Sequence, residues 1–289
     1  MAKVSIIIPS RAESFENLNR TIKSIYENAT GDFEVIIGLD GLPHTDVPDV
    51  FTNLQMIRFP SVVGIKTNIN AMCAMATGKY IYKSDAHCRF GKGFDEILQE
   101  CMDEDWIVMP RFKIIKDDWS IQMRDGQEEF YDYFYLCCPF TDPKGFRFKA
   151  GGHWPERTQE RLTSHPSVDE TPQIHGSGWF MSKDRYFELG GFPNIDPYGH
   201  AQEPIWLALK NSLMGGKVMV NKKTWYAHLH QQGNKRGYHM DKEQENKSYS
   251  IAANTFMSDP RMMGWLEKFL PMPTWPENWK EIYQKWLTK

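Results

Sequence analysis

The sequence predicts an α/β fold with a mostly parallel central sheet flanked by helices. Strand-like and helix-like segments alternate through residues 1–90, which is the order typical of an open α/β sheet. The first segment, residues 4–10, is a nearly continuous β-branched run, as expected for a strand that is buried on both faces. No GxGxxG motif and no P-loop motif follows this strand, so the sequence does not indicate a dinucleotide-binding protein or a P-loop NTPase.

The segment after the first strand predicts an amphipathic helix. Ser14 is its expected N-cap, because a serine oxygen at this position accepts a backbone N–H of the first helical turn. Apolar residues then recur at the spacing of one helical face. The residues expected on the buried face are Phe15, Leu18, Ile22 and Ile25.

The later elements follow from the same patterns and from their end signals. In the first half we expect strands at residues 33–41, 55–61 and 79–87, with a helix over 66–78 that ends at Gly78. In the second half we expect a strand at 106–112, a helix at 199–216 that ends at Gly215 and Gly216, and a strand at 217–230. The tail from residue 241 has a helical, aromatic pattern that is interrupted by Pro271, Pro273 and Pro276.

Composition narrows the class of protein. With 289 residues, of which 41% are hydrophobic, the chain can bury a large core as one domain or as two joined lobes. Its net charge of −3 gives no overall basic field, so broad binding of nucleic acid through phosphates is not predicted. Five cysteines without a CxxC pair indicate a reducing cytoplasm rather than disulfides or a zinc site. We expect no signal peptide and no membrane span, since no apolar run is long enough.

Polar residues collect where the predicted strands end. Ligands of open α/β sheets bind outside the carboxyl ends of the strands, and Asp85 and His87 lie at such an end. If the strand continues to residue 87, its alternation turns both side chains to the same face and Ala86 away. A carboxylate and an imidazole that converge in this way suit Mn²⁺ or Mg²⁺ shared with phosphate oxygens. A pair of this spacing also arises by chance.

Further stretches of the sequence support that reading, because together they resemble a known enzyme family. The chain resembles GT-A fold (Rossmann-like) nucleotide-sugar glycosyltransferases, both the family 2 enzymes and the catalytic domain of the polypeptide N-acetylgalactosaminyltransferases. The resemblance covers roughly residues 3–240. The stretches that carry it are residues 4–25 (first strand and helix), 64–88 (helix and metal motif), 176–192 (glycine-rich acceptor-side motif) and 201–230 (glutamate-bearing helix, paired glycines and terminal strand).

The resemblance implies a divalent metal site, holding Mn²⁺ or Mg²⁺, with Asp85 and His87 as two of its ligands. These residues belong to a D-x-H-C sequence, the form that is characteristic of the N-acetylgalactosaminyltransferases. The family pattern places the third ligand 25 positions after Glu203, and His228 stands there. His230 has the same facing on the predicted strand and stays an alternative.

The resemblance further implies a UDP-sugar as the donor substrate. Asp40 is similar in place to an acid that contacts uridine, although a turn residue is the plain alternative. Lys66 and Asn70 resemble positions lining the donor pocket, or else belong to a solvated helix face. The other residues expected at the donor are Ser10, Arg11 and Glu13 at base and ribose, and Arg236 and Tyr238 in a loop over the diphosphate or in a simple basic surface loop.

Glu203 is the expected catalytic acid or base, alongside Asp85 at the metal. It is the best candidate to contact the acceptor hydroxyl or to remove its proton, and the alternative is a carboxylate favoured at a helix N-terminus. The chain has Gln202-Glu203-Pro204 where family 2 enzymes commonly have Glu-Asp and the N-acetylgalactosaminyltransferases have Gly-Glu-Asn. This departure leaves open whether transfer retains or inverts the anomeric configuration.

We expect a glycosyltransferase domain over residues 1–240, with a nucleotide-sugar half at 1–100 and an acceptor half at 101–240. A helical, aromatic C-terminal extension, residues 241–289, is expected to pack on it. The enzyme would be a cytoplasmic hexosyl- or pentosyltransferase of a bacterium or a phage. Its acceptor would be a glycan, a small glycoside or a hydroxymethylated DNA base, and the sequence predicts no oligomeric state.

Two other function classes use part of the same pattern. A metal-dependent hydrolase or nuclease could activate water with an Asp-His-His set, but it leaves Asp40 and the acceptor-side motifs unexplained. A non-catalytic module that binds sugar or nucleic acid would tolerate loss of the ligands, whereas all of them stand in order here. The transferase interpretation therefore accounts for the most residues.

Overall fold

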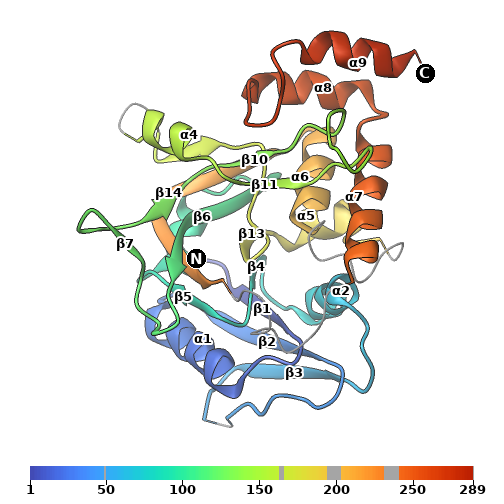
Figure 1. The fold of residues 1–289 in the computed structure, drawn as a ribbon. Helices are drawn as coiled ribbons and strands as arrows, with labels where there is room; N and C mark the ends of the chain where they lie inside the picture. Colours follow the sequence, from blue (N-terminus) through green and yellow to red (C-terminus); the bar gives the residue numbers. More distant parts are fainter. Residues whose placement is uncertain (49, 163–165, 194–202, 231–240, 289) are drawn as a thin grey trace.

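The N-terminal half of the chain forms the parallel part of a large sheet. The computed structural model describes residues 1–48, 50–162, 166–193, 203–230 and 241–288. Its first strands lie in the order β3-β2-β1-β4 and are mutually parallel. Their bounds are Val4–Ser10 for β1, Phe33–Asp40 for β2, Leu54–Phe59 for β3 and Tyr80–Ser84 for β4. The carboxyl ends of β1 and β4, which carry Ser10, Arg11 and Glu13 on one side and Asp85 and His87 on the other, therefore lie side by side (Figure 1).

The second half extends this sheet with strands of both directions. Strand β13 (Gly178–Ser182) lies antiparallel between β4 and β6 (Trp106–Ile115), and β14 (Lys217–Leu229) then runs parallel to β6. Strand β12 (Val168–Glu170) covers the edge. Short strands β5 (Cys88–Phe90) and β9 (Phe130–Tyr131) pair with β14 and β6. The sheet thus joins residues 80–90 to residues 178–182 and 217–229.

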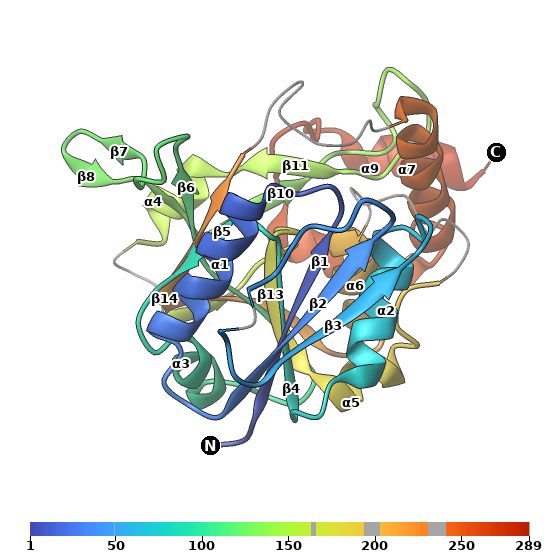
Figure 2. The same cartoon turned by 90° about the horizontal axis from the view of Figure 1, so that it is seen from below.

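Helices cover both faces of the sheet. Figure 2 shows α1 (Phe15–Asn28) and α2 (Ile65–Met75) on opposite faces of β1, β2 and β3. Strands β1 and β2 are almost entirely buried, as strands covered on both sides require, whereas the edge strand β3 is only partly buried. The helices of the second half are α3 (Phe94–Glu100), α4 (Pro155–Glu160), α5 (Lys183–Glu188) and α6 (Glu203–Leu213).

Two small antiparallel pairs lie outside the main sheet. Strands β7 (Met123–Arg124) and β8 (Gln127–Glu128) form an exposed hairpin. Strand β10 (Phe134–Leu136) pairs with β11 (Ala150–His153). The second pair matters for the site, because it brings His153 opposite Phe134 beside the end of β6.

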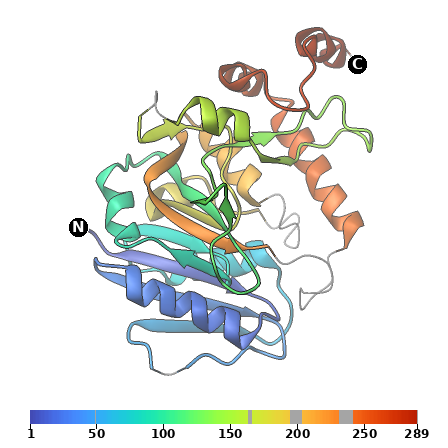
Figure 3. The same cartoon turned by 60° about the vertical axis from the view of Figure 1, so that its left-hand side comes forward.

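The C-terminal helices pack at the end of the molecule away from β3 (Figure 3). They are α7 (Lys242–Phe256), α8 (Pro260–Leu266), a 3₁₀ turn (Glu267–Phe269) and α9 (Trp279–Leu287). The ring of Phe256 lies 5.0 Å from that of Trp206 on α6, and Trp275 Nε1 donates to the Leu136 carbonyl at 2.7 Å. Pro271, Pro273 and Pro276 fall between the 3₁₀ turn and α9, where they interrupt the helical pattern as expected.

The predicted fold class is confirmed, with two local corrections. Ser14 caps α1 by accepting the N–H of Asn17 at 3.1 Å, but Phe15 is 50% exposed and does not join the buried face. Phe15 is the first residue of the helix and precedes the turns whose side chains Leu18 and Ile22 are buried. The predicted strand at 79–87 is also too long, since β4 ends at Ser84. No helix among the described residues is long and apolar enough to cross a membrane.

A buried carboxylate ties the amino ends of the parallel strands together. Glu34 on β2 accepts from the hydroxyl of Ser5 at 2.6 Å and from the N–H and hydroxyl of Thr77 at 2.7 and 2.8 Å. Lys3 and Gln55 contact its other oxygen at 3.3 and 3.2 Å. Burial alone would raise the pKa of Glu34, but these hydrogen bonds outweigh it and lower the pKa to about 2.

Glu34→Gln should therefore remove a pH-dependent part of the stability. Because the folded pKa lies below the ordinary glutamate value of 4.5, the charged form stabilises the protein above that pH, and the contribution is lost as pH falls toward 2. We expect the variant to lose about 3 kcal/mol of unfolding free energy at pH 7 and to approach wild type near pH 2. Denaturant titration measures this. Glu27→Gln on the exposed face of α1 should change stability by less than about 0.5 kcal/mol, and equal losses in the two variants would contradict the assignment.

Candidate metal and active site

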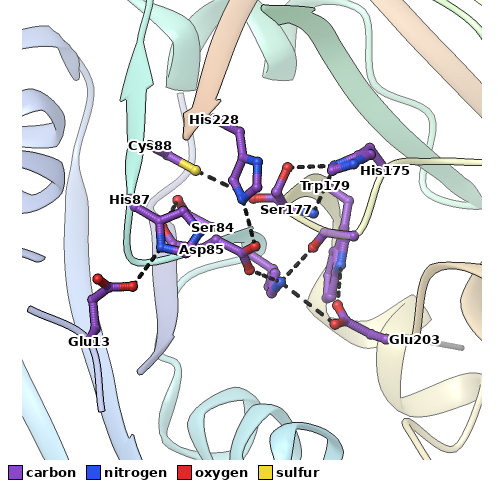
Figure 4. A network of polar contacts seen from close by, with 12 residues as sticks. Glu13, Ser84, Asp85, His87, Cys88, His175, Ser177, Trp179, Glu203 and His228 are labelled. Carbon is purple, nitrogen blue, oxygen red and sulfur yellow. Dashed lines mark hydrogen bonds and ion pairs between the residues drawn. The ribbon is translucent and has the colours of Figure 1, made fainter. Parts of the chain in front are cut away.

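The site lies where β4, β5 and β14 meet (Figure 4). Strands β5 and β14 are antiparallel and place His228 opposite Cys88, and the N–H of Leu229 donates to the carbonyl of His87 at 3.0 Å. On the other side, the N–H of Asp85 donates to the carbonyl of Ser177 at 2.9 Å. Backbone hydrogen bonds to two distant segments thus position the Asp85-Ala86-His87 turn.

Asp85 and His87 converge for a different reason from the one that the sequence predicted. Strand alternation requires an extended chain through residue 87, whereas residues 85–87 form a bend between β4 and β5. The bend is held by the hydrogen bonds just described, and it still turns Ala86 into the core. The two polar side chains share a face because β14 and the segment before β13 hold the turn.

Asp85, His87 and His228 form a compact group of possible metal ligands. One ligand atom from each lies within 4.8 Å of those of the other two. His228 Nε2 and Asp85 Oδ2 are 3.1 Å apart, and the rings of His87 and His228 have centroids 4.7 Å apart. A shared ion at about 2.1 Å from each donor needs only small movements of these side chains.

Glu13 orients the His87 ring. Its Oε2 lies 2.7 Å from His87 Nδ1, and a ring that is held through Nδ1 can present Nε2 to a cation. Glu13 is itself held by the N–H of Ser14 at 3.0 Å and by Asn17 Nδ2 at 2.9 Å. Burial raises the pKa of Glu13, but the hydrogen bonds with His87, Asn17 and Ser14 outweigh that effect, so the net direction is down. The residue predicted to hold base and ribose thus contacts the metal group.

A buried lysine holds Asp85 from the opposite side. Lys83, which is 1% exposed, donates to Asp85 Oδ1 at 2.6 Å and to the carbonyl of Gly176 at 2.5 Å. Its Nζ is also 3.6 Å from Glu203 Oε2. Burial lowers the pKa of Lys83, but the two carboxylates outweigh it and raise the pKa, so the ammonium keeps its charge. Oδ2 of Asp85 is the oxygen left facing the histidines.

Glu203 begins α6 and is 1% exposed. Its Oε1 accepts from Trp179 Nε1 at 2.9 Å, and its other oxygen faces Lys83. Burial raises the pKa of Glu203 and outweighs the opposing effects of Lys83 and Trp179. The carboxyl group therefore lies behind the metal group rather than on its open side.

The electrostatics of the group favour binding of a cation. Burial would raise the pKa of Asp85, but Lys83 and His228 hold it well below its usual range, so the carboxylate is charged at neutral pH. Burial lowers the pKa of His228 to about 3, so its ring is neutral and keeps a lone pair. One carboxylate and two imidazoles suit a divalent ion of the Mn²⁺ type, and this donor set fits one.

The structure distinguishes the two candidates for the third metal ligand, His228 and His230. His228 faces Asp85, while the ring of His230 lies beside those of His153 and His175, with centroids 6.3 and 5.8 Å away. His228 and His230 are neighbours, 4.8 Å apart between centroids, but the ligand group contains His228.

The residues predicted to bind the donor substrate differ in their burial and in their hydrogen-bond partners. Ser10 is 3% exposed at the end of β1, and its hydroxyl has no hydrogen-bond partner among the described residues. Asp40 accepts the backbone N–H groups of Val63 and Gly64 at 2.7 and 3.2 Å and so shapes the entry to α2. Lys66 is buried on α2 and contributes to the electrostatics of Glu203, and it does not belong to a solvated helix face.

Asn70 has a structural contact. Its amide bonds the N–H and the carbonyl of Phe192 at 3.0 and 2.9 Å and accepts from Tyr186 at 2.6 Å, which ties α2 to the glycine-rich segment. Arg11 is half-buried after β1. Arg236 and Tyr238 lie outside the described residues.

Sequence reasoning missed the group that backs the site, namely Lys83, Gly176 and Trp179. A signal for Lys83 was present, since a lysine inside the apolar run of residues 80–84 needs buried partners. No comparable signal marked the Gly176 carbonyl. Gly178 at the start of β13 has a steric reason to be glycine, because a Cβ there would lie 2.7 Å from the ring of Tyr226.

The chain is similar to known proteins over the segments that form this site. The model of the glycosyl transferase family 2 matches residues 5–177. A protein of Drosophila melanogaster, provisionally named polypeptide N-acetylgalactosaminyltransferase 13, is 25% identical over 296 residues, which cover 94% of this chain and 49% of the relative. Polypeptide N-acetylgalactosaminyltransferase 5 of Caenorhabditis elegans is 25% identical over 241 residues, covering 76% of this chain and 36% of the relative.

A solved structure is similar over nearly the whole chain. The crystal structure of GalNAc-T7 with UDP, GalNAc and Mn²⁺ matches with a TM-score of 0.69 at 14% identity, over 99% of this chain and 54% of that one. The GT-A fold is thereby confirmed. The chain spans about half or less of the length of these curated relatives.

Replacing the buried lysine should be costly. Lys83→Met leaves Asp85 and Glu203 without their shared cation, and loss of one partner from a buried ion pair destabilises by about 3–5 kcal/mol. Lys79→Met is the matched control, because the Lys79–Glu104 pair is exposed to solvent and its loss should change stability little. Denaturant unfolding compares them, and similar losses would contradict the assigned role of Lys83.

Two histidine variants separate the candidate third ligands. His228→Gln should weaken Mn²⁺ binding by at least about 100-fold, since even the partners of metal ligands contribute roughly 10–100-fold. His230→Gln, two positions along, should change the affinity by less than about threefold, because its ring lies outside the ligand group. Isothermal titration of each folded variant with MnCl₂ measures both. The reverse order would assign the ligand to His230.

Proposed function

Because the chain belongs to glycosyl transferase family 2, we propose that it transfers a sugar from a UDP-sugar to an acceptor hydroxyl with the help of Mn²⁺. The observation that carries the proposal is the Asp85, His87 and His228 group at the carboxyl end of β4. A ligand group at this edge of an open α/β sheet lies where such sheets bind nucleotides. A bound divalent cation would neutralise charge on the departing diphosphate.

The relatives support the choice of donor and ion. Their names describe polypeptide N-acetylgalactosaminyltransferases, and the similar structure holds UDP, GalNAc and Mn²⁺. The donor set found here, one carboxylate and two imidazoles, suits the same ion by its own chemistry. A UDP-hexose or UDP-N-acetylhexosamine is therefore the proposed donor, and a pentose donor stays the alternative.

Residues at the end of β1 are proposed to bind the nucleoside. The Ser10 hydroxyl is buried without a partner in the part of the chain that the structure describes, and such a group gains a hydrogen bond from a ligand at little cost. Arg11 follows it in sequence and keeps its proposed place at base and ribose, and Lys66 on the neighbouring helix α2 is proposed to line the donor pocket. Arg236 and Tyr238 keep their proposed place above the diphosphate. Asp40 and Asn70 are proposed to act indirectly, by shaping α2 and the segments next to it.

The transfer step exchanges one bond for another. The acceptor oxygen forms a bond to the anomeric carbon, the bond from that carbon to the diphosphate oxygen breaks with its electron pair going to UDP, and the hydroxyl proton leaves to a base. Glu203 was predicted as that base. Its contacts with Lys83 and Trp179 favour a different assignment, in which Glu203 fixes Lys83 and thereby the orientation of Asp85.

The domain bounds, the acceptor and the cellular compartment are proposed from the sequence. We propose one transferase unit over residues 1–240, with its nucleotide-sugar half at 1–100, its acceptor half at 101–240 and the extension at 241–289 packed on it. The acceptor is a hydroxyl of a glycan, a small glycoside or a hydroxymethylated base. The cysteine usage favours a reducing cytoplasm.

Release of UDP tests the proposed function. Purified protein is incubated with MnCl₂ and a panel of UDP-sugars, with and without acceptors, and UDP is measured. We expect release from at least one donor, its loss on chelation with EDTA and its recovery on addition of Mn²⁺. Asp85→Asn should lower the rate by on the order of 100-fold, because it removes the charged ligand. If neither EDTA nor Asp85→Asn lowers the release of UDP, the proposal is refuted.

A further inference from the structure

A cavity of about 650 Å³ opens beside the metal group, a size typical of pockets for small molecules. Its walls come from the end of β6, the β10–β11 pair and the end of β14, and they include Phe134, His153, His175 and His230. The rings of His175 and His230 have centroids 5.7 and 4.8 Å from that of His228. The cavity therefore shares a wall with the proposed metal site, although none of the residues that line it are ligands.

The wall consists largely of rings. Phe134 packs against His153 and His175, with centroids 5.1 Å away in each case, and His153 stacks on Tyr131 at 3.7 Å. Flat ring faces of this kind suit the apolar face of a cyclic ligand. Imidazole nitrogens in the same wall both donate to and accept from hydroxyl groups.

The cavity carries almost no net charge. Its charged lining residues are Lys116 and Asp117, which are neighbours of opposite sign. Burial, with a smaller effect of His230, lowers the pKa of His153 to about 4, so that this imidazole is neutral at pH 7. A ligand with phosphates would find a single lysine here with an acid beside it, whereas phosphate recognition needs several unopposed cations.

We propose that this cavity is the acceptor subsite and that it takes the neutral sugar ring of a glycoside, whose free hydroxyl points toward the metal group. The inference rests on the proposed function and narrows its acceptor. A hydroxymethylated base in DNA is disfavoured because its flanking phosphates would meet no basic surface among these residues. A peptide hydroxyl is the remaining alternative and is an outcome of the test.

The test compares acceptors and then variants. Wild-type protein with MnCl₂ and its active UDP-sugar is offered p-nitrophenyl glycosides of galactose, glucose and their N-acetylated amines, a hydroxymethylcytosine oligonucleotide, and a serine- and threonine-containing peptide. We expect transfer to a glycoside, detected by mass spectrometry. His153→Ala should raise the KM for that glycoside by about tenfold and leave UDP release without acceptor unchanged.

A control double variant removes the two charged side chains that line the cavity. Lys116→Met combined with Asp117→Asn should leave the glycoside KM within about twofold, because a neutral ligand does not depend on these charges. A second measurement needs no variant: the glycoside should protect His153 from modification by diethyl pyrocarbonate, mapped by mass spectrometry of the wild-type protein.

Each possible result either supports or overturns the acceptor assignment or the proposed function. Transfer to DNA or peptide in preference to glycosides, an unchanged KM in folded His153→Ala, or no protection of His153 would each overturn the acceptor assignment. Absence of UDP release from every donor would instead overturn the proposed function, which is a distinct result.

Discussion

The site depends on one buried ammonium group. Lys83 joins the carboxylate of Asp85, the carbonyl of Gly176 and the carboxylate of Glu203, which come from three separate segments of the chain. A charge in the interior is tolerated only when it is paired and hydrogen-bonded. Lys83 therefore needs these three partners, and the two buried carboxylates in turn need Lys83. The orientation of Asp85 therefore follows from the packing of β4, the segment before β13 and α6.

A second set of contacts fixes the histidines in the same way. Glu13 at the start of α1 bonds His87, and β14 brings His228 to Asp85 through its pairing with β5. The ligand group is thus assembled from the first and last parts of the described sheet. Because every member is held by hydrogen bonds or strand pairing before any ion arrives, little conformational entropy remains to be lost on binding.

The local patterns of the chain predicted most of the elements. The β-branched run of β1, the Ser14 cap and the apolar spacing of α1 are short-range signals, and the structure has them as predicted, except at Phe15. The D-x-H sequence and the spacing to His228 pointed to the residues that the fold brings together. The reason given for their convergence was wrong, because strand alternation is a local rule and the bend at residues 85–87 is held by partners 90 and more positions away.

The sequence alone determined the layered sheet, through hydrophobic periodicity, and it identified the candidate ligands through residue types that suit a cation and through the resemblance to a known enzyme family. Only the tertiary structure decided that Glu13 contacts His87, that Glu203 lies buried behind Lys83, and that a ring-lined cavity opens beside His228. Burial and pairing of a polar group are properties of contacts between distant segments. A single chain read in order carries no direct record of them.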